Sequence, residues 1–134
     1  MNISAKLKVS ASKSTTSPSC KPLPASFLKM TAKEFVENFK LEKDSLLKEF
    51  TNIESQTEVQ KLIQSMKLNE EQAEFLKEVL NSTLLDTFYT ILLGLDGCSM
   101  IGESQQLYEI KDENGNLLSG EIEGYAYEYF HEME

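Results

Sequence analysis

Apolar side chains recur every three or four residues along most of the chain after residue 30, the spacing that places them on one face of an α-helix. Capping residues mark three helix starts. Thr31 and Glu34 have the spacing of a capping box, Thr57 begins a second run, and Asn69 precedes two glutamates that suit the positive end of a helix. The pattern therefore predicts three helices that begin at these caps.

The most apolar part of the chain is the run LLDTFYTILLGL at 84–95. We expect a central buried helix here, separated from the preceding helix by the polar residues at 81–83. The run has 12 residues and contains Asp86. A membrane-spanning helix needs roughly 20 apolar residues, so the sequence predicts no membrane segment.

Two regions have patterns typical of strands. Leu107 and Ile110 precede an Asn-Gly pair, which predicts a β-hairpin near 106–119. Strict alternation over 3–11 predicts an N-terminal strand that joins this hairpin. The predicted fold is therefore α+β: mainly helical, with about four or five helices and a small antiparallel sheet.

The last helix is predicted from the segment GEIEGYAYEYFHEME at 120–134. Its apolar side chains fall at helical spacing and form one stripe, so most of its aromatic content is assigned to the core. Tyr127 lies off this stripe, and Glu121, Glu128 and Glu132 lie on the solvent side. The stripe consists of Ile122, Tyr125, Ala126, Tyr129, Phe130 and Met133.

Charge divides the chain into two regions. Residues 1–30 form a basic segment rich in Ser, Thr and Pro, which is either the predicted strand with a linker or a leader such as an organellar transit peptide. Residues 31–134 form a single acidic globular domain, and 101–134 alone hold nine acidic residues and one lysine. All 13 basic residues are lysine, so the arginine fork that recognises phosphates and guanine is absent. This balance disfavours nucleic acid and favours a basic protein as partner.

No catalytic or cofactor motif stands out. A calcium-loop pattern at 112–123 has oxygen ligands at four positions, but Leu117 occupies the place where the sharp turn needs glycine. Cys98 and the sole histidine, His131, do not follow a known nucleophile motif, and two distant cysteines do not form a metal site. We therefore expect no enzymatic activity, no cofactor and no metal.

Binding is the function class that remains. The sequence predicts a small acidic cytoplasmic protein of the inhibitor or immunity type, which masks a basic partner such as a nuclease. The alternative is an adaptor or assembly factor, organellar if 1–29 is a transit peptide, that docks through the apolar helix or the basic N-terminal segment. The predicted partner-binding residues lie in the last helix and are Glu121, Glu123, Tyr127, Glu128, His131 and Glu132.

Overall fold

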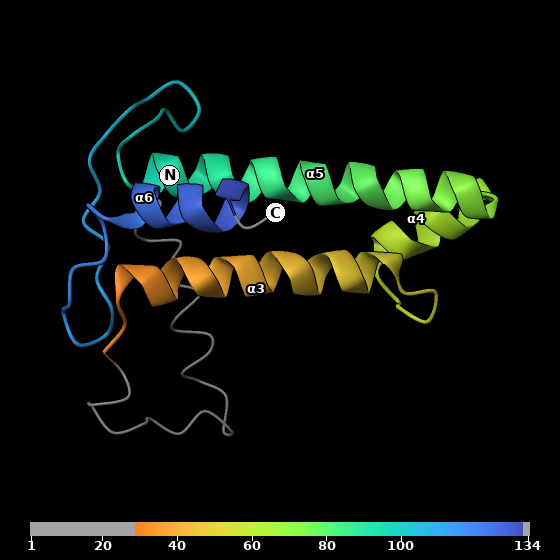
Figure 1. The fold of residues 1–134 in the computed structure, drawn as a ribbon, viewed down its shortest axis with the longest axis horizontal. Coiled ribbons are helices and arrows are strands. Elements are labelled where there is room, and N and C mark those ends of the chain that lie inside the picture. Colours follow the sequence, from red (N-terminus) through yellow and green to blue (C-terminus); the bar gives the residue numbers. More distant parts are fainter. Residues whose placement is uncertain (1–28, 133–134) are drawn as a thin grey trace.

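The computed structural model describes residues 29–132, which form four α-helices and a short π-helix. The α-helices are α3 (Ala32–Thr51), α4 (Glu58–Met66), α5 (Glu70–Leu95) and α6 (Ile122–Tyr127), and the π-helix η1 (Glu128–Glu132) continues directly from α6 (Figure 1). None of the described helices combines the length and apolar character needed to cross a membrane.

The three predicted capping positions are confirmed. The hydroxyl of Thr31 accepts a hydrogen bond from the backbone of Glu34, whose carboxylate accepts one from the backbone of Thr31. Asn69 forms the same reciprocal pair with Gln72, and Thr57 caps α4. Each cap satisfies backbone donors that the first helical turn leaves unpaired.

The interruption expected at 81–83 is wrong, because α5 runs without a break for 26 residues. The hydroxyl of Thr83 donates to the carbonyl of Val79 at 2.7 Å, one turn earlier. A polar side chain that bonds within its own helix does not end that helix. The apolar run at 84–95 is therefore the second half of one long helix.

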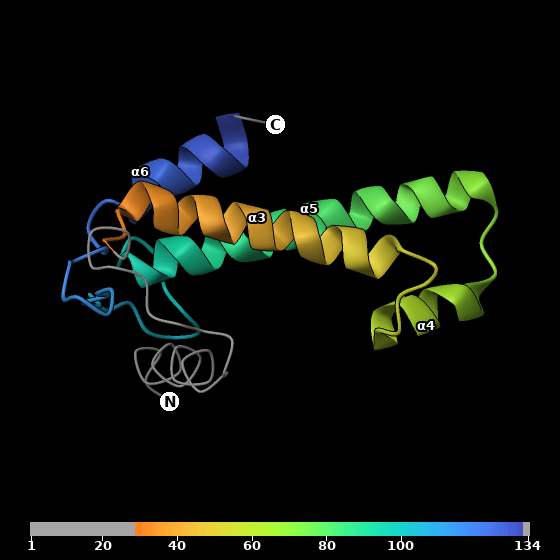
Figure 2. The same ribbon diagram turned by 90° about the horizontal axis from the view of Figure 1, so that it is seen from below.

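The long helices α3 and α5 lie side by side in opposite directions (Figure 1). Figure 2 shows α6 and α4 on opposite sides of this pair and at opposite ends of it. We call the end that carries α6 and η1 the proximal end, and the end that carries α4 the distal end. The proximal end also includes the loop at 96–121, which links α5 to α6.

The apolar core lies entirely at the proximal end. Helix α6 contacts both α3 and α5 there, so three helices and the loop enclose one cluster. Val36, Leu92 and Phe130 have no exposed surface. The full set of buried apolar residues is Ala32, Val36, Leu85, Leu92, Leu95, Ile110, Leu118, Ile122, Ala126 and Phe130.

The predicted α+β fold is wrong, since the described residues contain no strand or sheet. The expected hairpin near 106–119 is a loop with a single bridge between Lys111 and Leu117. Pairing ends at Ile110, whose backbone N–H donates to the hydroxyl of Ser119 at 3.1 Å rather than to a backbone carbonyl. The carboxylate of Asp112 binds backbone N–H groups only within the turn. The strand expected at 3–11 lies outside the described residues.

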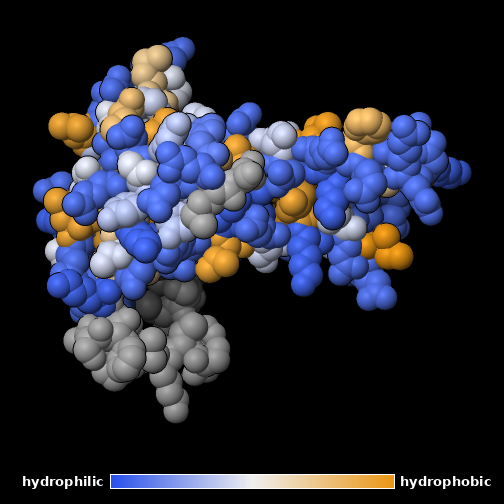
Figure 3. All heavy atoms as spheres, viewed as in Figure 1, coloured by the Kyte–Doolittle hydropathy of each residue, from blue (hydrophilic) through white to orange (hydrophobic). Residues whose placement is uncertain are grey.

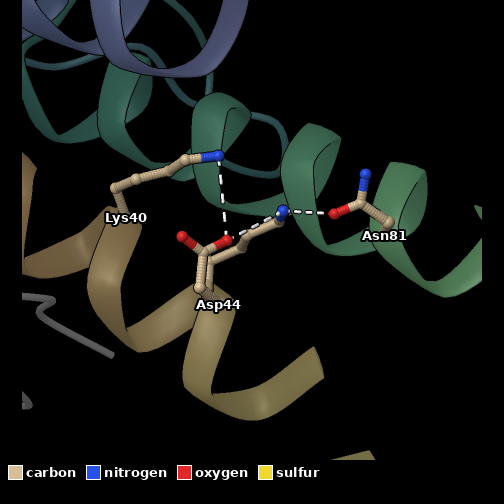
Figure 4. Close-up of polar contacts among 4 residues, drawn as sticks. Lys40, Asp44 and Asn81 are labelled. Carbon is tan, nitrogen blue, oxygen red and sulfur yellow. Dashed lines mark hydrogen bonds and ion pairs between the residues drawn. The ribbon is translucent and has the colours of Figure 1, made fainter. Parts of the chain in front are cut away.

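A buried lysine marks the boundary between the two ends. The ammonium group of Lys43 on α3 is 2% exposed and donates to the amide oxygen of Asn81 on α5 (Figure 4). It also pairs with Asp44 at 3.2 Å, and Asp44 in turn lies 3.8 Å from the ammonium group of Lys40. A buried charge requires such partners, so this contact fixes α3 against α5 midway along their length.

Apolar burial is much poorer at the distal end. Between Glu37 and Leu84, the only buried residues are Lys43 and Gln60, both polar. Figure 3 shows hydrophobic side chains at the surface of the distal end, separated by hydrophilic ones. A cavity of about 230 Å³ lies between α4, α5 and the end of α3. The exposed apolar residues here are Ile53, Leu62, Met66, Phe75 and Val79.

Candidate functional site

Helix α6 begins at a carboxylate from a distant part of the chain. Its own N-cap residue, Glu121, makes no side-chain capping bond. Asp96, which is buried at the end of α5, instead accepts hydrogen bonds from the backbone N–H groups of Gly120 and Glu123, the latter at 2.8 Å. A negative charge at the start of a helix is favourable, so Asp96 both anchors α6 and orients it against α5.

The inner face of α6 and η1 belongs to the core, as the sequence predicted. Ile122, Ala126 and Phe130 are fully buried. On the side facing α3, the hydroxyl of Tyr129 donates to the carboxylate of Glu37, and this hydrogen bond raises the pKa of Tyr129 to about 12. The core holds the inner side of α6 and η1, and Asp96 holds the start of α6. The outer face of these two helices, which points away from the core, is therefore carried by a fixed backbone.

All six predicted partner-binding residues are exposed on this outer face. Glu123, Tyr127 and His131 are spaced four residues apart, which places them in one row along the helix. Glu128 and Glu132 form a second row with the same spacing. The exposed set is Glu121, Glu123, Tyr127, Glu128, His131 and Glu132.

The structure adds a residue to this surface that the sequence did not reveal. Tyr89 of α5 contacts His131, with ring centroids 4.4 Å apart and the rings perpendicular. His131 in turn lies 5.4 Å from the ring of Tyr127, at an interplanar angle of 36°. Three aromatic rings, from α5, α6 and η1, thus meet at this surface. The one feature of the sequence that could have indicated this role is the polar hydroxyl group of Tyr89 within an apolar part of the helix.

The electrostatic environment of these rings is negative. The pKa of the Tyr89 hydroxyl is raised by burial, and further by the negative charges that Glu123, Tyr127 and Cys98 carry when ionised. No lysine or arginine follows Lys111 in the sequence, although Lys40 of α3 lies 5.7 Å from the centre of the Phe130 ring of η1. The potential at this surface therefore favours a positively charged group.

Cys98 and His131 do not form a nucleophile pair in this arrangement. The thiol of Cys98 makes its hydrogen bond to the backbone carbonyl of Asp96, at 3.8 Å. Burial raises the pKa of this thiol, and the carboxylates of Asp96 and Glu123 raise it further. A raised pKa keeps the sulfur in the thiol form, which is a poor nucleophile.

Asp112, the first position of the calcium-loop pattern, has a different role. Its two oxygens accept hydrogen bonds from the backbone N–H groups of Met30, Asn114 and Asn116 and from the Asn116 side chain. These donors lower the pKa of Asp112 to about 2, with the Asn116 side chain the largest cause. Within residues 29–132, no group of three or more His, Cys, Asp or Glu side chains is arranged to hold a metal ion.

No family model, curated protein or solved structure matches this chain. The outer face of α6 and η1, with its exposed glutamates and neighbouring aromatic rings, is the surface that bears most directly on function.

Proposed function

We propose that this protein is a small acidic binding protein of the inhibitor or immunity type, which masks a basic protein partner such as a nuclease. The partner contacts the outer face of α6 and η1, where the four glutamates match a positively charged groove. A cytoplasmic location is part of this proposal, with an organellar one as the alternative.

One observation supports this proposal above the others. Four glutamates, a tyrosine and a histidine are exposed on one short element, while the opposite side of that element is buried in the core and its start is bound by Asp96. Such a surface meets a partner without first being ordered, which reduces the entropy cost of binding. The exposed Tyr127 supplies the type of aromatic anchor that is common at interfaces.

The test uses the partner that the full-length protein captures from its host. Association rates are measured by stopped flow from about 10 mM to about 300 mM salt, a range over which screening grows strongly. We expect a fast association that slows with salt, and a much slower one for Glu128→Lys. Glu71→Lys on α5, an exposed glutamate at the distal end, is the control with the same charge change.

The two outcomes are distinct. Slower association for Glu128→Lys, with Glu71→Lys close to wild type, places the partner on the proximal acidic face. Equal effects of the two variants, or rates that ignore salt, would show that this face is solvated surface and would contradict the proposal.

The adaptor alternative requires a docking surface that differs from the acidic face of α6 and η1. Leu85, Leu92 and Leu95 of the apolar helix are buried, so this stretch does not offer them to a partner. Exposed apolar residues such as Leu62 and Phe75 at the distal end could serve for docking, as could Leu107 in the loop at 96–121. The basic N-terminal segment, the other docking element of this alternative, lies outside the described residues. An adaptor that docks through the distal end would lose its partner on changes there and retain it with Glu128→Lys.

A further inference from the structure

We propose that Tyr89, Tyr127, His131 and Glu123 form a receptor for a guanidinium group, supplied by an arginine side chain of the basic partner. This inference rests on the proposed function, because it names the chemical group that the acidic face selects. The structure provides both components of such a receptor, aromatic rings and a carboxylate, on α5, α6 and η1.

The aromatic component consists of three rings, in which His131 lies between Tyr89 and Tyr127 and contacts both. The ring of Tyr89 is perpendicular to that of His131, and the Tyr127 ring is tilted by 36° to the same His131 ring. Tyr127 is 50% exposed, so a face of its ring is open to solvent. A flat guanidinium stacks on such a face through both dispersion and cation–π attraction.

The carboxylate component is Glu123, one helical turn before Tyr127. Its charge reaches Tyr89, since it is the largest electrostatic contribution to the raised pKa of that hydroxyl. The side chain of Glu123 is exposed, whereas its backbone N–H is bound to Asp96 at 2.8 Å. The backbone of Glu123 is therefore held in place while its carboxylate is exposed to solvent. This arrangement suits a charge-assisted hydrogen bond to a stacked guanidinium.

Arginine fits this arrangement better than lysine. The guanidinium is planar and delocalised, and it keeps several N–H donors in its plane while its face lies on an aromatic ring. A lysine ammonium is compact and strongly hydrated, and it gains less from a ring. The net charge of the acidic face attracts both residues, but a carboxylate can also favour arginine through a bidentate pair. Loss of the preference in a variant that lacks the Tyr127 ring, rather than the preference itself, therefore reports on the rings.

Two peptides of equal charge separate these contributions. Tetra-arginine and tetra-lysine are titrated separately into the full chain, with binding measured by NMR shifts of the tyrosine and histidine ring signals. We expect tetra-arginine to bind roughly three- to tenfold more tightly than tetra-lysine, as a cation–π contact at a partly exposed site implies. The largest shifts should be those of Tyr127, Tyr89 and His131.

Three variants make the test specific. Tyr127→Leu removes the exposed ring and should abolish the preference for arginine while leaving weak binding of both peptides. Glu123→Gln keeps the size of the side chain and should weaken tetra-arginine more than tetra-lysine. Phe75→Leu, which removes an exposed ring at the distal end, is the control and should bind like wild type.

Failure of the receptor is distinguishable from failure of the proposed function. Equal binding of the two peptides, unchanged by Tyr127→Leu but weakened by Glu128→Lys, would leave the acidic face as a binding surface and overturn the receptor. Absence of binding by both peptides would also overturn the receptor, while the host partner's response to Glu128→Lys would still decide the function.

Discussion

The two ends of the α3–α5 pair are stabilised in different ways. At the proximal end, α6 closes a core in which Val36, Leu92 and Phe130 have no exposed surface. At the distal end, side-chain amides make the contacts between elements: Gln60 donates to the carbonyl of Phe50 at 2.6 Å, and Gln64 donates to that of Ile53 at 2.8 Å. One end therefore has a fully buried apolar core, whereas the other combines half-buried apolar side chains with these hydrogen bonds.

This difference bears on function. Burial of an apolar side chain gives roughly 1.5–3 kcal/mol, whereas a neutral hydrogen bond gives about 0.5–1.5 kcal/mol net. The candidate site lies on the end with the buried apolar core, where the backbone that carries it is held by the core and by Asp96. The distal end should open more easily without disturbing that site.

The largest expected effect comes from a matched pair of substitutions, one at each end. Phe130→Ala empties a fully buried position and should cost roughly 3–5 kcal/mol. Phe75→Ala removes a ring that is 60% exposed and should cost less than about 1 kcal/mol. Urea unfolding followed by circular dichroism measures both. Comparable losses in the two variants would mean that the distal end contains a core of its own.

The second effect concerns the anchor of α6. Asp96→Ala removes the acceptor for two backbone donors and should cost roughly 1–3 kcal/mol, because those donors lose their partner in a partly buried place. Hydrogen exchange should become faster in α6 and stay unchanged in α4. Asp86→Ala, on the exposed side of the same helix, is the control and should stay within about 0.5 kcal/mol of wild type.

Local spacing was enough to predict some of these features. The caps at Thr31, Thr57 and Asn69 depend on residues three positions away, and the buried stripe through Ile122 and Phe130 depends on helical periodicity. These parts of the fold were therefore visible in the sequence. The same reasoning found all six exposed residues of the outer face.

The parts that failed depend on contacts that spacing does not reveal. The predicted sheet was wrong because the backbone N–H of Ile110 donates to the Ser119 hydroxyl, so that strand pairing stops after one bridge. The predicted break in α5 was wrong because Thr83 bonds to its own helix. Tyr89 and Asp96 were missed as site residues because their partners, such as His131 and Glu123, lie more than 25 positions further along the chain.

A smaller effect is expected from the amide contacts at the distal end. Gln60→Ala leaves the carbonyl of Phe50 without this donor and should cost about 0.5–1.5 kcal/mol. Exchange should become faster in α4 and at the end of α3, with α6 unaffected. Gln64→Ala removes a similar but exposed bond and should have less effect. Faster exchange in α6 would show that the two ends unfold together.

The smallest effect is a pH dependence confined to the proximal end. Asp112 joins Met30, just before α3, to the loop that leads to α6, and its hydrogen bonds lower its pKa from 3.8 to about 2. A lowered pKa means that the folded state favours the charged carboxylate, so this contribution is present above pH 3.8 and is lost as pH falls towards about 2.

Melting temperatures of wild type and Asp112→Asn, measured across this acid range, test the assignment. The variant should be less stable near neutral pH, because an amide presents one acceptor oxygen where the carboxylate presents two. The difference should shrink as the wild-type carboxylate becomes protonated, whereas Asp86→Asn, on the exposed face of α5, should follow the wild-type curve throughout. A gap between wild type and Asp112→Asn that stays constant with pH would show that the ionised carboxylate does not tie the loop to α3, and the proximal end would then depend on its apolar core and Asp96 alone.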